Sequence, residues 1–280
     1  MMTDGWIYYN HAAIPTVSPK DEPDTALIRS GEIWKTDGHP LLARWTTDFD
    51  CGHETGWWYV VKDTPFDIGL LKAKRRYEIN KGSRFFDVRR ICAGAYRDEL
   101  YRIQVAAFSV YPAKYRPTVD KDRFLAEMDS CEDIVFGAFF RETGKLAGYA
   151  RLSQSWAGVM SFSVLKTDPE YEKYAVNAAL VEKILSHCAD FLSAGGLICD
   201  GERSISHETH FQDYLEKYFG FRKAYCRLHI AYRPKIRLAV KLLYPFRGLL
   251  RRLDRIRAVH QINAVIRMEE ICRREPRPTD

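Results

Sequence analysis

The stretch that decides the fold is DPEYEKYAVNAALVEKIL, residues 168–185. Asp168 followed by Pro169 is typical of a helix start, because the carboxylate can cap free amides and proline fits the first helical turn. The apolar residues that follow recur at steps of three and four, which predicts a helix with one buried face that ends at Gly195-Gly196. A strand-to-helix turn is therefore predicted here.

Strands and helices alternate on both sides of this turn. Strands are predicted at 84–91, 133–140, 146–153, 157–165, 197–200 and 221–232, and further helices at 97–108, 119–130 and 207–219. This order predicts an α/β or α+β domain whose mixed central sheet is flanked by helices. The strand-prone, turn-rich residues 1–80 predict an N-terminal β-rich extension, 81–233 the central domain, and 234–280 a tail of basic helices.

Composition narrows the class of protein. With 280 residues, 46% of them hydrophobic, the chain can bury a sizeable core. No run of about 18 apolar residues predicts a membrane span, and the first residues do not resemble a signal peptide, which together favour a cytoplasmic protein. The seven cysteines are odd in number and form no C-x-x-C pair, so neither a disulfide framework nor a metal site is predicted.

Positive charge is concentrated in the tail. From Pro234 onward 12 Lys and Arg stand against five acids, whereas the rest of the chain is close to neutral. Within the tail, apolar residues predict one face of a basic amphipathic helix: Leu249, Leu253, Ile256, Ile262 and Ile266. Such a helix can lie on an anionic membrane surface, which would make the protein membrane-peripheral. It can also pack on the body or on a partner, which is the interpretation we favour.

The succession of elements over 84–233, including GFR at 220–222, resembles the GNAT superfamily of N-acyltransferases. The resemblance implies that the strand at 157–165 splays from its neighbour and that acetyl-CoA or another acyl-CoA docks there. It also implies an oxyanion donor at the backbone N–H of Val164 or Leu165. The pyrophosphate would bind to the next loop and helix N-terminus, where free N–H groups and the helix dipole attract anions.

The loop departs from the family pattern R/Q-x-x-G-x-G/A. Glu172 stands at the Arg or Gln position, and Ala175 and Asn177 stand at the two glycines. A side chain at these glycines takes up space, and losing a charged hydrogen bond costs about 1.5–3 kcal/mol. We therefore expect weakened acyl-CoA binding. The residues predicted to bind the cofactor are Val164, Leu165, Lys173, Tyr174, Ala175, Val176 and Asn177.

Acyl transfer needs a base, oxyanion donors and an acid. The resemblance implies that the acid is a tyrosine of the penultimate helix, here Tyr214 or Tyr218, which share a helical face. The motif SISHETH supplies His207 and Glu208 as candidate bases. The alternative for these two residues is a helix cap and a solvated surface position. The same motif places His207 and His210 three residues apart, and two histidines at this spacing could chelate a metal only with a third ligand. No third ligand is visible, so no metal site is predicted.

A second resemblance concerns the FemAB-like branch, which transfers amino acids from aminoacyl-tRNA to cell-wall precursors without the CoA loop. The similar segments are KAKRRYEINKG at 72–82 and SHETHFQDYLEKYFGFRKAY at 206–225. The main prediction is transfer from acyl-CoA to a small or glycan-linked amine, for example a cell-envelope precursor. The alternatives are a FemAB-like enzyme, which alone implies a nucleic-acid partner, and a non-catalytic binding module of the same fold.

Overall fold

The computed structural model describes residues 2–3, 5–111, 116–205 and 210–274. The chain divides into two compact units, each formed from separate segments. Unit 1 comprises residues 1–60, 202–210 and 223–280, and unit 2 comprises 61–201 and 211–222. Unit 2 contains most residues that the sequence nominates for function, so it is described first.

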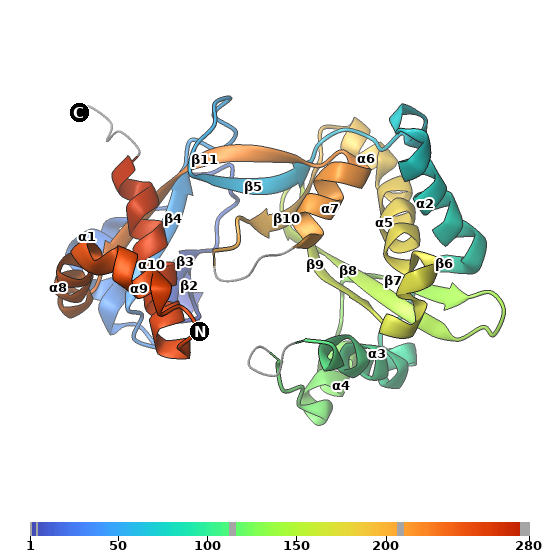
Figure 1. Ribbon diagram of the computed structural model, residues 1–280, viewed down its shortest axis with the longest axis horizontal. Helices are drawn as coiled ribbons and strands as arrows, with labels where there is room; N and C mark the ends of the chain where they lie inside the picture. The colour runs from blue at the N-terminus through green and yellow to red at the C-terminus, as the bar shows by residue number, and fades with distance from the viewer. Residues whose placement is uncertain (1, 4, 112–115, 206–209, 275–280) are drawn as a thin grey trace. The chain divides into compact units, whose positions relative to one another are not determined.

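The strands of unit 2 lie in the order β10-β9-β8-β7-β6 (Figure 1). Their bounds are β6 Phe86–Ile91, β7 Ile134–Phe140, β8 Leu146–Trp156, β9 Val159–Thr167 and β10 Leu197–Glu202. Neighbours from β6 to β9 are antiparallel, and β10 is parallel to β9. Most of β7 and the first half of β8 are buried on both sides, as expected of strands covered by helices on both faces.

The helices of unit 2 cover the two faces of these strands. They are α2 Ala73–Phe85, α3 Arg97–Ser109, α4 Lys121–Asp129, α5 Val176–His187, α6 Ala189–Ser193 and α7 His210–Phe219. Figure 1 shows α2 and α5 on one face, and α3 and α4 on the other. Helix α2 is an addition to the predicted elements. Its apolar periodicity is weak, because only Ile79 and Gly82 among its residues are buried.

Unit 1 joins the two ends of the chain in one sheet. Its strands β1 Met2–Thr3, β2 Trp6–Tyr9, β3 Ala12–Pro15, β4 Leu42–Thr47 and β11 Arg222–Tyr232 lie in that order, and β5 Trp57–Lys62 leads into unit 2. The late strand β11 pairs antiparallel with β4, from Arg227 opposite Thr47 to Tyr232 opposite Leu42. A small core beside α1 Ala26–Ser30 contains Trp6 and Ile33.

The tail contains α8 Pro234–Leu243, the short 3-10 turn η6 Tyr244–Phe246, α9 Arg247–Arg252 and α10 Arg257–Arg274. The prediction of one continuous apolar face was wrong, because the chain turns between α9 and α10. Consequently Ile256 is 54% exposed whereas Ile266 is 2% exposed. In the part of the chain that the structure describes, no helix combines the length and apolarity needed to cross a membrane.

Candidate active site

Strands β9 and β10 part within unit 2. They pair only from Val159 opposite Leu197 to Ser161 opposite Cys199. Beyond that point β9 stays paired with β8 through Thr167, so its backbone groups that point away from β8 have no strand partner among the described residues. We call this point the strand fork: Phe162–Thr167 of β9 and Asp200–Gly201 of β10. The splayed strand implied by the resemblance is thus present.

A β-bulge at Ser163 changes the direction of the side chains in β9. Arg151 pairs with Val164 whereas Leu152 pairs with Phe162, so Ser163 is the extra residue. A bulge interrupts the normal alternation of faces. Val164 accordingly packs against the buried cluster of α3 and α4, whereas Phe162 contacts aromatic residues of and after α7.

The start of α7 reaches both strands of the fork. The ring of Phe211 lies 6.4 Å from the ring of Phe162 on β9, measured between centroids. The next residue, Gln212, hydrogen-bonds the side chain of Asp200 on β10. Three elements that are distant in sequence therefore place their side chains around one point.

Asp200 is the functional candidate that sequence reasoning missed. Burial raises the pKa of its carboxyl group to about 7, although the hydrogen bond from Gln212 opposes this shift. A carboxyl group with a pKa near neutrality can accept a proton during catalysis. The available signal was an acid at the end of the otherwise apolar strand LICD, residues 197–200.

The two candidate tyrosines continue the aromatic contacts along α7. Ring centroids lie 6.2 Å apart for Phe211 and Tyr214, and 4.9 Å apart for Tyr214 and Tyr218. Burial and the nearby Glu78 carboxylate raise the pKa of the Tyr214 phenol. Tyr214 therefore keeps its proton at neutral pH and can donate a hydrogen bond. The guanidinium of Arg75 lies over the ring of Tyr218, 5.9 Å from its centroid.

The other two catalytic candidates, His207 and Glu208, lie outside the described residues. Their roles as bases stay predictions. Among the described residues, no group of three or more His, Cys, Asp or Glu is arranged to hold a metal ion.

The loop before α5 is partly exposed, and none of its residues is fully buried. It forms a 3-10 helix, Pro169–Tyr174, capped by the Asp168 carboxylate, which accepts a hydrogen bond from the amide of Glu170. The Tyr174 ring packs against Phe85 and Phe140, with centroids 4.8 and 5.1 Å away.

The remaining cofactor candidates differ in exposure. Ala175 and Val176 are 6% and 0% exposed, and Asn177 accepts a hydrogen bond from the Thr167 hydroxyl at 3.3 Å. Lys173 is exposed, with its amino group over the Tyr174 ring. The roles of these side chains in cofactor binding stay predictions, as does that of Leu165, which is half-buried in β9.

Helix α2 lies directly on the first turn of α5. A Cβ atom added at Gly82 would come within 2.6 Å of the Ala175 carbonyl oxygen and 2.9 Å of the Ala179 backbone nitrogen. That side of the turn is therefore filled by backbone rather than open to a phosphate group.

Ala175 has a left-handed backbone with φ of 63°, the conformation that glycine adopts most easily. We expect Ala175→Gly to raise the free energy of unfolding by about 0.5–1 kcal/mol. Left-handed geometry costs an L-residue roughly 1–2 kcal/mol, which glycine would not incur. The greater entropy of glycine in the unfolded state cancels roughly half of this gain. Urea denaturation measures the difference. The control Ala179→Gly, inside α5, should lower stability, and equal losses from both changes would contradict the strain argument.

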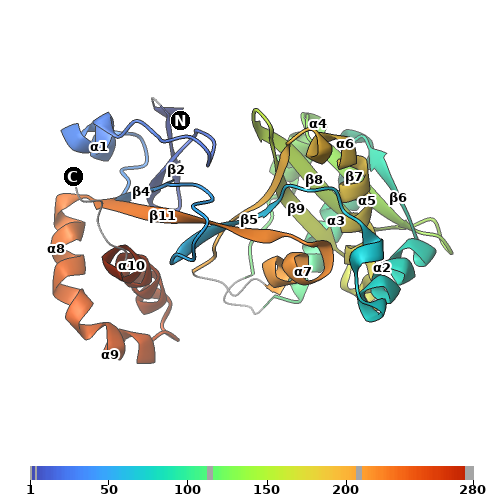
Figure 2. The same cartoon turned by 90° about the horizontal axis from the view of Figure 1, so that it is seen from above.

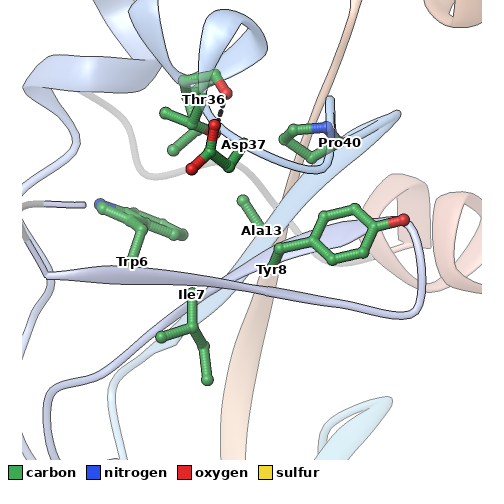
Figure 3. A pocket seen from close by; sticks show the side chains of 8 residues that line it. Trp6, Ile7, Tyr8, Ala13, Thr36, Asp37 and Pro40 are labelled. Atoms are coloured by element: carbon green, nitrogen blue, oxygen red, sulfur yellow. Dashed lines mark hydrogen bonds between the residues drawn. The ribbon is translucent and has the colours of Figure 1, made fainter. Parts of the chain in front are cut away.

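Unit 1 contains a separate small hollow (Figure 3). It is lined by Trp6, Ile7, Tyr8, Ala13, Ile33, Thr36, Asp37 and Pro40. The Thr36 hydroxyl donates a hydrogen bond to the Ile33 carbonyl, so it serves the local turn. Only Asp37 brings an ionisable carboxyl group, and the hollow therefore offers less chemistry than the strand fork.

Comparison with solved structures identifies similar folds. The structure of L-PGS from Bacillus licheniformis matches with a TM-score of 0.52 and 12% identity, covering 88% of this chain and 85% of that one. The C-terminal domain of a putative lysylphosphatidylglycerol synthetase from Agrobacterium fabrum matches with a TM-score of 0.52 and 11% identity, covering 84% and 82%. A conserved protein of unknown function from Bacteroides thetaiotaomicron has a TM-score of 0.54 at 10% identity, covering 82% and 83%.

No family model matches the sequence, and no curated protein sequence is significantly similar to it. The matching structures also include GCN5-related N-acetyltransferases and FemX, at TM-scores below 0.5. At such low identities these likenesses concern the fold alone. At that level the predicted fold is confirmed: the chain has a mixed sheet flanked by helices, in a fold shared with the Bacillus licheniformis and Agrobacterium fabrum structures.

Proposed function

We propose that the protein transfers an aminoacyl group from aminoacyl-tRNA to an amine or hydroxyl acceptor, with the reacting carbonyl at the strand fork. The observation that carries this proposal is that the strands part beside Asp200 while α2 fills one side of the first turn of α5. Carbonyl chemistry at the fork is thus supported, whereas pyrophosphate binding at α5 is disfavoured.

The residues around the fork suit each step of acyl transfer. The acceptor's nucleophilic atom attacks the ester carbonyl carbon, and the Asp200 carboxylate takes the acceptor's proton. Backbone N–H groups of β9 near Val164 stabilise the oxyanion. The carbon–oxygen bond to the ribose then breaks, and the ribose oxygen receives the proton that Asp200 took from the acceptor. A phenol that stays protonated, as Tyr214 does, can assist this departure by hydrogen bonding.

The charge of α2 favours a tRNA donor over a coenzyme. This helix contains five Lys and Arg but one acid, Glu78, and its Lys74, Arg76 and Arg84 are exposed. A basic helix of this kind attracts a phosphate backbone at many points. In contrast, the α5 loop presents Glu172 where the family's pattern has an arginine or glutamine.

Acyl-CoA remains the second candidate donor. The segment of β9 from Phe162 to Thr167 has backbone groups without a strand partner among the described residues, and the resemblance implies that pantetheine pairs with such an edge. A glycan-linked amine or cell-envelope precursor stays within the proposed acceptor class. The name of the putative lysylphosphatidylglycerol synthetase structure indicates a lipid product for that protein, so a lipid hydroxyl belongs in the same acceptor screen.

Binding of fluorescein-labelled tRNA, followed by anisotropy, tests the donor. We expect affinity to fall about tenfold or more between 50 and 200 mM salt, as displaced counterions require. The variant Lys74→Glu/Arg76→Glu should weaken binding at least tenfold, whereas Lys183→Glu/Lys217→Glu, exposed lysines of α5 and α7, should change it little. A thermal shift with acyl-CoA together with no tRNA binding would favour the second candidate.

A further inference from the structure

An exposed apolar stripe runs along the tail within unit 1. We define the apolar stripe as Leu238, Leu242, Phe246, Leu249, Leu253 and Ile256, whose side chains are 43–62% exposed. These residues follow one another at steps of three and four through α8, η6, α9 and the turn after it. Large apolar side chains gathered in this way usually mark an interaction surface.

In α8 the apolar Val240 is buried, whereas α9 and the turn after it contact α10 through backbone and polar groups. Asn263 of α10 donates hydrogen bonds to the Leu250 carbonyl at 2.9 Å and to the Asp254 carboxylate at 2.6 Å. Arg251 of α9 forms an ion pair with Glu270 of α10. Figure 2 shows α8 and α9 in an arc around α10. The contacts with α10 therefore hold α9 in place while the residues of the apolar stripe stay exposed.

Basic side chains surround the apolar stripe. Six of them are exposed and form no ion pair among the described residues: Lys235, Arg237, Lys241, Arg252, Arg255 and Arg257. The only acid between Pro234 and Arg257 is Asp254, and its carboxylate already binds Asn263 and His260. The segment thus combines exposed apolar area with uncompensated positive charge.

We propose that the apolar stripe and these six basic residues dock the protein on the surface of an anionic lipid bilayer, with α8 and α9 lying in the interface. Apolar side chains can insert at the boundary between headgroups and acyl chains, while Lys and Arg bind anionic headgroups. A bilayer provides both properties at once.

Co-sedimentation of the full chain with vesicles tests this proposal. Vesicles of phosphatidylcholine with 30% phosphatidylglycerol should bind at least tenfold more protein than pure phosphatidylcholine, and the difference should shrink as salt rises from 50 to 500 mM. Equal binding to both kinds of vesicle, or to neither, would overturn the proposal. Concentration-dependent self-association without vesicle binding would assign the apolar stripe to a second copy of the chain instead.

Two variants separate the apolar and electrostatic contributions. Leu238→Ser/Leu242→Ser/Leu249→Ser and Lys235→Glu/Lys241→Glu/Arg252→Glu should each lower binding to anionic vesicles at least tenfold. Val105→Ser/Val110→Ser, which changes exposed apolar residues of unit 2, is the matched control and should bind like the parent. All substituted residues are exposed, so circular dichroism should show intact folding. Unchanged binding by both tail variants would refute the assignment of the surface.

Discussion

Replacing Asp200 with asparagine is expected to lower the transfer rate by a factor of about 100 or more, because general-base catalysis contributes roughly 10²–10⁴. In the parent protein, kcat/KM should rise with pH through about 7, since a base must lose its proton before it can accept one. The variant should lose this rise, because asparagine does not titrate. Steady-state rates between pH 5.5 and 9 measure both effects, once a donor and acceptor pair is in hand.

The matched control for this prediction is Asp190→Asn, which changes an exposed aspartate of α6. It should keep both the rate and the pH dependence. A rate for Asp200→Asn within threefold of the parent would exclude the base role. A lowered rate that keeps the same pH dependence would assign the titration to another group, His207 or Glu208 being the first to test.

The raised pKa of Asp200 also predicts how the stability of the protein depends on pH, an effect that can be measured independently of catalysis. Its pKa is raised in the folded protein to about 7, above the unfolded value near 3.9, so the protonated form is favoured by folding. The contribution of Asp200 to the free energy of unfolding is therefore greatest below about pH 4 and is lost as pH rises through 7. At pH 8, Asp200→Asn should be as stable as the parent or more so, by at most about 4 kcal/mol at 1.36 kcal/mol per pKa unit.

Most elements of unit 2 could be predicted because their apolar periodicity is local. The strands from β6 to β10 and the helices α3, α4 and α7 fall close to their predicted ranges, whereas the single helix predicted from Asp168 to Gly195 divides into the 3-10 helix Pro169–Tyr174, α5 and α6. The positive φ at Ala175 also agrees with the alignment that set this residue at a glycine position. Helix α2 was missed because its stabilising contacts are tertiary: a glycine and an isoleucine bury themselves against other elements, which leaves no amphipathic pattern to detect.

The candidate site was less accessible to sequence reasoning. Tyr214 could be nominated from its place in a helix. The raised pKa that makes Asp200 a candidate base depends instead on burial at the point where two strands part, and its hydrogen-bond partner Gln212 belongs to another element. Likewise the spacing of apolar residues in the tail could be counted, but not which side of α9 would face α10. The side of α9 that faces α10 is held by hydrogen bonds from Asn263, and no local sequence pattern predicts these hydrogen bonds.

Substituting Gly82 with alanine should destabilise the protein, although the same change in an open helix is stabilising. Alanine is favoured over glycine inside helices by about 0.5–1 kcal/mol. At Gly82, however, the new methyl group would lie 2.6 Å from the Ala175 carbonyl oxygen and 2.9 Å from the Ala179 nitrogen. Both atoms belong to backbone, so the two helices must separate. Overpacking of this kind costs about 1–3 kcal/mol, and a branched residue such as valine should cost more.

Gly248 of α9 is the matched control, because a Cβ atom there meets nothing within 4 Å. Gly248→Ala should raise the free energy of unfolding by up to about 1 kcal/mol, while Gly82→Ala lowers it, and urea denaturation distinguishes the opposite signs.

The contact between Gly82 and the first turn of α5 also leads to a prediction about ligand binding. If separating α2 from α5 opens the first turn of α5, Gly82→Ala should bind acyl-CoA more tightly than the parent while losing affinity for tRNA. A stabilised Gly82→Ala variant with unchanged ligand binding would mean that α2 does not close this turn.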